Sequence, residues 1–172
     1  ARVAALRARL AALGPAPYIG VTWSAGTSPR DQKGGPWLLY KHVDLDAFAG
    51  ALAPAPGTLL ALQRLPEPGT LEQLAARAGR PVHDLTALNE DLEEMLALLS
   101  LLDDYVGVSN TNVHLRASLG LPSRVLVPSQ GEWRWMLTGR TSPWFPGTLL
   151  YRQSLQGDWG DALATLAADL VP

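Results

Sequence analysis

Short, continuous apolar runs alternate along this chain with segments whose apolar residues recur at helical spacing. The apolar runs indicate strands at 18–23, 58–63, 82–85, 104–108, 125–127 and 148–152. The helical segments are 1–13, 44–52, 71–78, 89–102, 111–119 and 161–170. Continuous apolar strands are typical of sheets buried on both faces, and their alternation with helices is typical of parallel sheets. We therefore predict a three-layer α/β fold, with a parallel sheet and helices on both of its faces.

Helix start and stop signals support this division of the chain. Asn89 is expected to be the N-cap of the helix that runs to Leu102, and Asn110 that of the helix at 111–119. Gly120, at C′ of the second helix and followed by Pro122, is expected to end it.

Length and composition bound the class of protein. With 172 residues, of which 47% are hydrophobic, the chain can bury one sizeable core. A formal net charge of −2 and a pI of about 5.9 argue against binding to nucleic acid. The absence of cysteine excludes disulfides and cysteine-based metal sites. No apolar run is long enough for an integral membrane segment, and we expect a cytoplasmic protein.

The first residues read as a helix already under way, without an initiator Met or a signal peptide. Gly14, Pro15 and Pro17 end this helix. We expect 1–17 to be a linker helix, 18–172 to be the folded domain, and the chain to be a fragment of a longer protein.

The segment 103–119 is the most informative for function, because a strand breaks into a polar turn that opens directly into a helix. The free N–H groups of a first helical turn and the positive end of its macrodipole favour a bound anion such as a phosphate. Asn110 and Thr111 stand at that turn. The same residues are also ordinary helix caps, so on spacing alone a capped turn and an anion site are equally good interpretations.

The loop after the first strand is a second candidate. Trp23, Ser24 and Gly26 leave the carboxyl edge of the predicted sheet, and the small residues would let a ligand approach the backbone. The loop lacks both the Gly-rich dinucleotide fingerprint and the phosphate-loop Gly-Lys-Ser/Thr, so it supports neither a Rossmann dehydrogenase nor a phosphate-loop nucleotidase. Lys41 stands where this loop is expected to return.

Other polar and aromatic residues complete the candidate site. His114 lies three residues after Thr111, on a helix face from which it could reach a group docked at the helix start. Three scattered histidines without acidic neighbours at ligand spacing predict no metal site. Trp133 and Trp144 could stack on a base or sugar, although such side chains more often fill cores or cover interfaces. Arg134 could reach past them toward a phosphate.

Taken together, these segments resemble the C-terminal, nucleotide-binding half of a GT-B glycosyltransferase of the ADP-heptose:lipopolysaccharide heptosyltransferase type. The resemblance is greatest to the heptosyltransferase-like domain found behind tetratricopeptide repeats in bacteria. It rests on five motifs in order: Ile-Gly-x-x-Trp at 19–23, a Leu-Asp strand at 102–106, residues 109–116 as the counterpart of the family's [Ser/Gly]-Asp-Thr-x-x-x-His-Leu-Ala motif, Trp-Arg-Trp at 133–135 and Ser-Pro-Trp-[Tyr/Phe]-Pro at 142–146.

The resemblance implies a Rossmann-like domain that binds a nucleotide diphosphate sugar as its donor substrate, without a metal or other cofactor. The residues that would bind the donor are Trp23, Ser24, Gly26, Lys41, Ser109, Asn110, Thr111, Asn112 and His114. Trp133, Arg134 and Trp144 are possible contacts to the base or sugar. In this family the Asp-Thr turn and a Lys hold the diphosphate. Asn110 replaces the family's Asp and Arg116 its usual Ala, so we expect an altered charge beside the donor.

The resemblance also implies that the acceptor site belongs to an N-terminal domain outside this chain. The acceptor, whether a glycan, a lipid-linked sugar or a protein, is not indicated by these residues, and no residue stands out as a general base. Two alternatives stay open. One is a domain that has kept the fold, lost the donor site and serves as a protein-interaction or scaffold module. The other, less favoured, is a sugar-nucleotide epimerase, for which no catalytic carboxylate pair stands out.

Overall fold

The computed structural model describes residues 1–28, 32, 40–130 and 132–171, and it shows a Rossmann-like α/β fold built on one seven-stranded sheet. The strand order is β5-β4-β1-β6-β7-β9-β8. The parallel strands are β1 (Tyr18–Thr22), β4 (Thr58–Ala61), β5 (Val82–Asp84), β6 (Asp104–Val108), β7 (Arg124–Val127) and β9 (Phe145–Arg152). The edge strand β8 (Thr141–Ser142) runs antiparallel to β9. The predicted fold class is therefore confirmed, with one short antiparallel edge that we did not predict.

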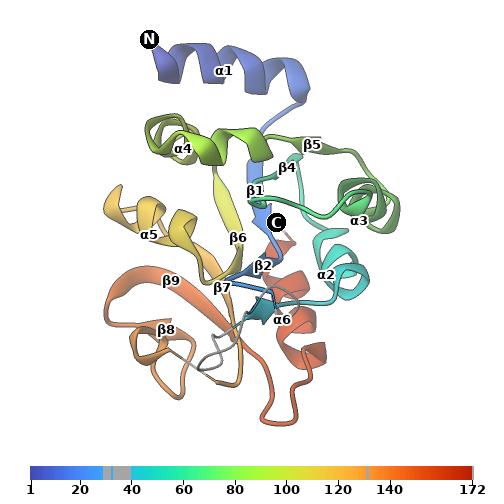
Figure 1. Ribbon diagram of the computed structural model, residues 1–172, viewed down its shortest axis with the longest axis vertical. Helices are drawn as coiled ribbons and strands as arrows, with labels where there is room; N and C mark the ends of the chain where they lie inside the picture. The colour runs from blue at the N-terminus through green and yellow to red at the C-terminus, as the bar shows by residue number, and fades with distance from the viewer. Residues whose placement is uncertain (29–31, 33–39, 131, 172) are drawn as a thin grey trace.

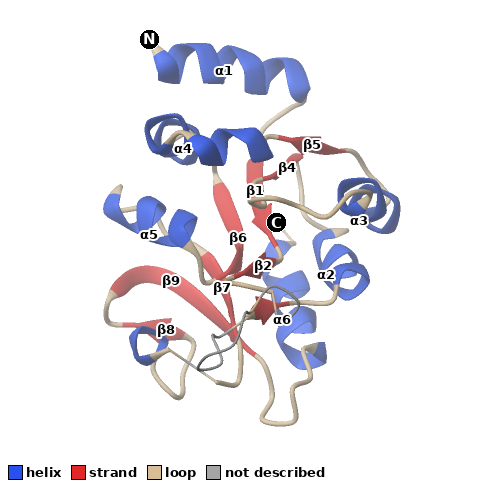
Figure 2. Ribbon diagram, viewed as in Figure 1, coloured by secondary structure: helices blue, strands red, loops and turns tan. Residues whose placement is uncertain are grey.

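Six helices cover the sheet in the part of the chain that the structure describes. They are α1 (Arg2–Leu13), α2 (Leu45–Leu52), α3 (Thr70–Ala78), α4 (Leu92–Leu99), α5 (Thr111–Ser118) and α6 (Gly160–Leu170). Figure 1 shows α4 and α5 on one side of the sheet and α2, α3 and α6 on the other. Figure 2 shows the strands forming the layer between them. None of the described helices combines the length and the apolar character needed to cross a bilayer.

The core has two halves because successive side chains of a strand point to opposite faces of the sheet. In β4, Leu59 and Ala61 pack under α2 and α3, whereas Leu60 belongs to the cluster under α1, α4 and α5. Leu6 and Leu10 of α1 are buried in that second cluster, so the expected helix at the N-terminus packs on the domain. Its predicted role as a linker stays a prediction.

Two of the expected helix boundaries are confirmed and one is wrong. Asn110 caps α5, and Gly120 follows α5 in the left-handed conformation expected at C′. The N-cap of α4, however, is Asp91, whose Oδ1 accepts hydrogen bonds from the amides of Glu93 and Glu94. Asn89 instead lies in the 3₁₀ helix η1 (Thr86–Glu90), where its Nδ2 donates to the Leu62 carbonyl. A long-range contact therefore holds Asn89 away from the cap position.

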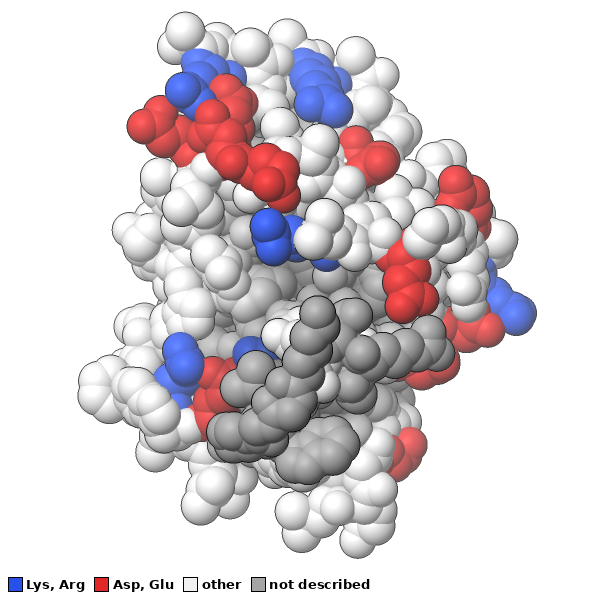
Figure 3. Space-filling view, viewed as in Figure 1, with Lys and Arg blue, Asp and Glu red and all other residues white. Residues whose placement is uncertain are grey.

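Charged side chains gather at the end of the molecule where α1 lies over α4. Arg2 of α1 pairs with Asp91, Glu93 and Glu94 in the first turn of α4. Figure 3 shows these acidic side chains beside basic ones over the two helices. The pairs are largely exposed, and pairs of this kind contribute at most about 1 kcal/mol each.

Candidate functional site

A pocket of about 1000 Å³ opens at the carboxyl edge of the sheet. Numbered along the chain, the six parallel strands lie in the order 3-2-1-4-5-6, so the connections diverge between the first and the fourth, β1 and β6. Ligands of open α/β sheets bind at such a switch point, outside the carboxyl ends of the strands. The segments that line the pocket follow β1, β4 and β6, and include the start of α5 and residues 132 and 134.

The loop after β1 forms one wall of the pocket and is held by a side chain that we did not predict. Gln63, which directly follows the β4 run, accepts hydrogen bonds through Oε1 from the amides of Trp23 (3.1 Å) and Ser24 (3.0 Å). Its Nε2 donates to the Ser24 carbonyl. The Trp23 ring packs in the core. The only signal in the sequence for this role of Gln63 was its position as a polar residue at the end of an apolar run.

Two short strands at the ends of this loop pair with each other beside the pocket. The short strands β2 (Ser24–Ala25) and β3 (Lys41–His42) are antiparallel, and Lys41 lies opposite Ala25. Gly26, just after β2, has φ of 91°, a conformation that other residues rarely adopt. The prediction that Lys41 lies near the return of the loop is confirmed, and its side chain lines the pocket.

The start of α5 lies at the base of the pocket, as its turn suggested. Asn110 caps the helix, because its Oδ1 accepts a hydrogen bond from the Val113 amide (3.2 Å). Its Nδ2 donates to Thr22 Oγ1 (2.8 Å) and to the Tyr105 hydroxyl (2.9 Å). The polar atoms of Asn110 are thus engaged with the protein. Thr111, the first residue of α5, is exposed and faces the pocket.

Asn112 completes the polar floor. Its side chain is buried, hydrogen bonds to Tyr105 and donates from Nδ2 to Asn89 Oδ1 (3.3 Å). Burial raises the pKa of Tyr105 to about 12, although the hydrogen bonds to Thr22, Asn110 and Asn112 act in the opposite direction. The Tyr105 hydroxyl is therefore neutral at physiological pH and acts as a structural hydrogen-bonding group.

A compact charged cluster lies beside the start of α5. Glu132 Oε1 is 2.9 Å from Lys41 Nζ, and Glu132 Oε2 is 2.7 Å from Arg134 Nη2. The Ser109 hydroxyl also hydrogen bonds to Glu132. Burial alone would raise the pKa of Glu132, but the contacts with Lys41, Ser109 and Arg134 lower it overall. We did not predict Glu132, because its partners Lys41 and Ser109 are distant in the sequence.

His114 extends this cluster toward the aromatic residues. Its Nε2 lies 3.4 Å from Arg134 Nη1, and its ring packs edge-on against Phe145. Burial lowers the pKa of His114, and the positive charges of Arg134 and Lys41 lower it further against the opposing charge of Glu132. His114 is therefore mainly neutral at pH 7 and can accept a hydrogen bond from Arg134.

The tryptophans of the Trp-rich segment have different environments. Trp135, in the 3₁₀ helix η2 (Trp133–Trp135), is fully buried beside Phe145. Trp133 and Trp144 are 70% and 58% exposed and stack edge to face, with ring centroids 5.2 Å apart. Neither of these two lines the pocket, whereas Arg134 does. Their contact to a base or sugar stays a prediction.

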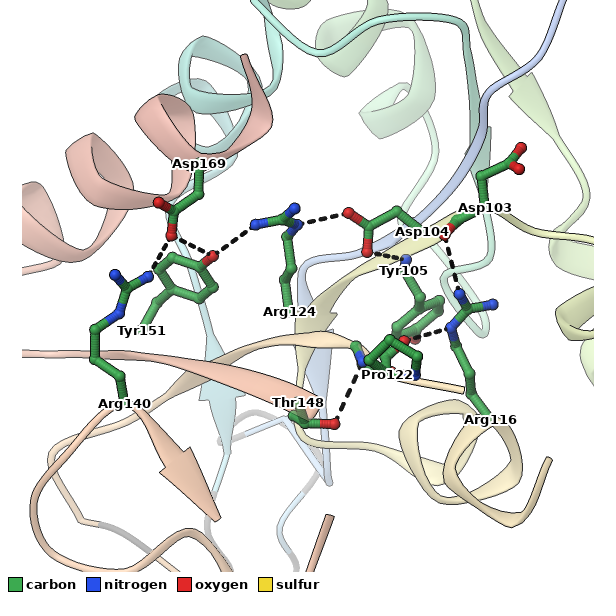
Figure 4. A network of polar contacts seen from close by, with 11 residues as sticks. Asp103, Asp104, Tyr105, Arg116, Pro122, Arg124, Arg140, Thr148, Tyr151 and Asp169 are labelled. Carbon is green, nitrogen blue, oxygen red and sulfur yellow. Dashed lines mark hydrogen bonds and ion pairs between the residues drawn. The ribbon is translucent and has the colours of Figure 1, made fainter. Parts of the chain in front are cut away.

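The expectation that Arg116 alters the charge beside the donor is wrong. Its side chain is 1% exposed and points away from the pocket toward the end of α4. The guanidinium donates to the carbonyls of Leu99 (2.9 Å), Leu102 (3.1 Å), Asp103 (3.2 Å) and Pro122 (2.7 Å). Two of these contacts are drawn in Figure 4. Because the last carbonyls of a helix lack intrahelical partners, Arg116 satisfies acceptors that burial would otherwise leave unpaired.

The site can bind an anionic group next to neutral hydrogen-bonding groups. Lys41 and Arg134 carry two positive charges against the single negative charge of Glu132, and the start of α5 adds its partial positive charge. Among the described residues, no three His, Asp or Glu side chains are grouped so that they could hold a metal ion.

The fold and the position of the pocket define a Rossmann-like α/β domain with a candidate ligand site at its topological switch point. The chain is similar to Protein FlbA of Caulobacter vibrioides, with 25% identity over 176 residues. The match covers 99% of this chain but only 28% of the length of FlbA. No protein-family model matches the chain, and no solved structure matches it.

Proposed function

We propose that this domain binds the nucleotide diphosphate sugar donor of a glycosyltransferase related to the GT-B heptosyltransferases. The observation that carries the proposal is the meeting of three features in one pocket at the switch point. These are the cations Lys41 and Arg134, the free end of α5 at Thr111, and the floor that contains the buried side-chain amide of Asn112. A diphosphate fits the first two features, and the hydroxyl groups of a ribose or sugar fit the third.

The contribution of this domain to catalysis would be electrostatic. In glycosyl transfer the bond between the sugar carbon and the diphosphate oxygen breaks, and negative charge builds up on the departing diphosphate. Lys41, the Thr111 hydroxyl and the first amides of α5, which line the pocket, would stabilise that charge. Removing one such contact typically costs roughly 3 to 4 kcal/mol of transition-state stabilisation. The acceptor and its general base would come from another part of the full-length protein.

Calorimetry of the full-length protein with ADP-, UDP- and GDP-sugars tests this proposal. We expect one of the three classes to bind, and Thr111→Val to weaken that binding about tenfold through loss of one charge-assisted hydrogen bond. Thr138→Val is the matched control, because Thr138 is exposed and does not line the pocket. Absence of binding by the unaltered protein at millimolar concentrations of all three classes would reject the proposal.

A second function, a non-catalytic interaction module, is favoured by two observations. Glu132 already engages both Lys41 and Arg134, and the large rings of Trp133 and Trp144 stand exposed at the surface. This alternative predicts a protein partner whose capture is lost with Trp144→Ala, together with no binding of sugar nucleotides. Protection of residues 107–114 from hydrogen exchange by a nucleotide sugar would exclude it.

A further inference from the structure

Glu132 has the surroundings of a bound anion. Its two carboxylate oxygens contact Lys41 Nζ at 2.9 Å and Arg134 Nη2 at 2.7 Å, and it hydrogen bonds to the Ser109 hydroxyl. The side chains of Lys41 and Glu132 are only 15% and 16% exposed. Charge-assisted bonds of this length, partly shielded from water, are screened less than those of an exposed surface ion pair.

The same donors are those that an oxyanion ligand in the pocket would use. A phosphate group and a carboxylate both accept hydrogen bonds from ammonium, guanidinium and hydroxyl donors at these distances. Ser109 immediately precedes Asn110 and the first turn of α5, so the cluster adjoins the helix end that also favours an anion. The carboxylate of Glu132 and a ligand phosphate therefore compete for one set of donors.

The side chain of Glu132 can leave these donors without unfolding its segment. The residues that follow it are held separately by Arg152, whose guanidinium donates to the carbonyls of Trp135, Met136 and Gly139. Ser142 Oγ also donates to the Arg134 carbonyl (2.6 Å). A change of side-chain rotamer at Glu132 would break its contacts with Lys41 and Arg134 while leaving these backbone contacts in place.

We propose that Glu132 is an internal competitor that occupies the anion subsite of the pocket and must be displaced before a phosphate-bearing ligand binds. The identity of the natural ligand in this inference rests on the proposed function. The test uses inorganic pyrophosphate and does not depend on that function. It makes Glu132 the residue that sets the affinity of the pocket for anions. In the undisplaced state the single negative charge of Glu132 offsets one of the two positive charges and engages both cations, and with Glu132 removed both are free to bind a ligand.

The test measures binding of inorganic pyrophosphate by calorimetry to the unaltered protein and to Glu132→Gln. The amide is isosteric with the carboxylate and removes its charge, so we expect pyrophosphate to bind at least about tenfold more tightly to the variant. Glu67→Gln is the matched control, because Glu67 lines the same pocket, is exposed and carries the same charge. It should change the affinity less than about twofold if the effect comes from the freed donors rather than from net charge.

Each outcome of the measurement decides the inference. Equal or weaker binding of pyrophosphate to Glu132→Gln, or an equal gain in Glu67→Gln, overturns it. Circular dichroism establishes that the variants are folded, and Glu132→Ala, which removes the carboxylate altogether, should show the same gain in affinity. Nucleotide sugars titrated into the same proteins separate the two proposals. If Glu132→Gln gains pyrophosphate binding and no protein binds a nucleotide sugar, the inference stands and the proposed function fails.

Discussion

The hydroxyl oxygens of Thr22, at the end of β1, and Tyr105, near the start of β6, lie 2.9 Å apart and join the two central strands below the pocket. Asn110 hydrogen bonds to both of them and also caps α5. A single buried network thus sets the distance between β1, β6 and the helix that faces the ligand site. Networks of this kind stabilise a fold when every member is satisfied and destabilise it when one partner is removed.

Asn110→Ala should therefore destabilise the protein by about 2 kcal/mol, because it removes the helix cap and leaves the two hydroxyl groups short of a partner. Asn110→Asp is the comparison, since its carboxylate can still accept hydrogen bonds from the Val113 amide and from both hydroxyls. It should lose less than about half as much stability. Urea denaturation measures both changes, and equal stability of Asn110→Ala and the unaltered protein would contradict this account of the network.

Arg116→Met should destabilise the protein by about 3 kcal/mol, because four carbonyl oxygens lose the guanidinium that satisfies them. Any ligand affinity of the folded protein should be unchanged, since Arg116 does not line the pocket. Arg77→Met is the control, because Arg77 does not line the pocket and its side chain is 62% accessible. A melting temperature of Arg116→Met equal to that of the control would show that Arg116 has another role. So would a loss of ligand affinity in Arg116→Met that is fully folded.

Stability should fall in alkaline solution through Tyr105. Its pKa in the folded protein is about 12, above the ordinary value of 10.0, so the folded state holds the phenol proton more tightly than the unfolded state. This stabilisation is complete below pH 10.0 and is lost as the pH rises to about 12, and it amounts to about 3 kcal/mol.

Denaturant titrations across that pH interval measure the effect in the unaltered protein and in Tyr105→Phe. Burial also raises the pKa of Tyr151, in the network of Figure 4, so part of the alkaline loss remains in the variant. The loss should nevertheless be smaller in Tyr105→Phe. Parallel curves for the two proteins would exclude Tyr105 as a source of the pH dependence.

Gly107 allows the close approach of β6 to β1, and Gly107→Ala should disturb it. A Cβ atom at this position would lie 2.1 Å from Thr22 Oγ1 and 2.7 Å from the Thr22 carbonyl oxygen. We expect a loss of about 2 kcal/mol, because backbone must shift to relieve the overlap. Gly50→Ala is the control within α2, where a Cβ meets nothing within 4 Å, and it should stabilise the protein by about 0.5 to 1 kcal/mol. In thermal denaturation, Gly107→Ala should have a lower melting temperature than the unaltered protein and Gly50→Ala a higher one.

Much of the fold could be predicted from the sequence because the signals were local. The strand of β6 and the helix of α5 follow from an apolar run, a cap at Asn110 and a terminating glycine at Gly120, all within a few residues of one another. The cap of α4 was predicted wrongly for the opposite reason. Asn89 and Asp91 are both good caps, and the hydrogen bond from Asn89 to Leu62, 27 residues away, decides between them.

The candidate site was predictable in part. Its position follows from the order of the elements, since polar residues after parallel strands collect at one edge of a sheet. Gln63 and Glu132 were missed because neither belongs to a local motif, and each is defined by atoms it meets from other segments. Arg116 was placed in the wrong surroundings because a charged residue on a helix gives no sign of which carbonyls lie within its reach.

The sequence by itself determined the type and order of the elements, and with them the parallel sheet and the edge at which a ligand can bind, because backbone preference and apolar periodicity depend on near neighbours. Only the tertiary structure decided which polar groups are free in the pocket. Lys41 and Glu132 are 91 residues apart in the chain, and Lys41 Nζ lies 2.9 Å from Glu132 Oε1. Whether each charge is paired depends on that contact. The energy of a buried or half-buried charge is set by its partners, and in this protein those partners come from distant segments.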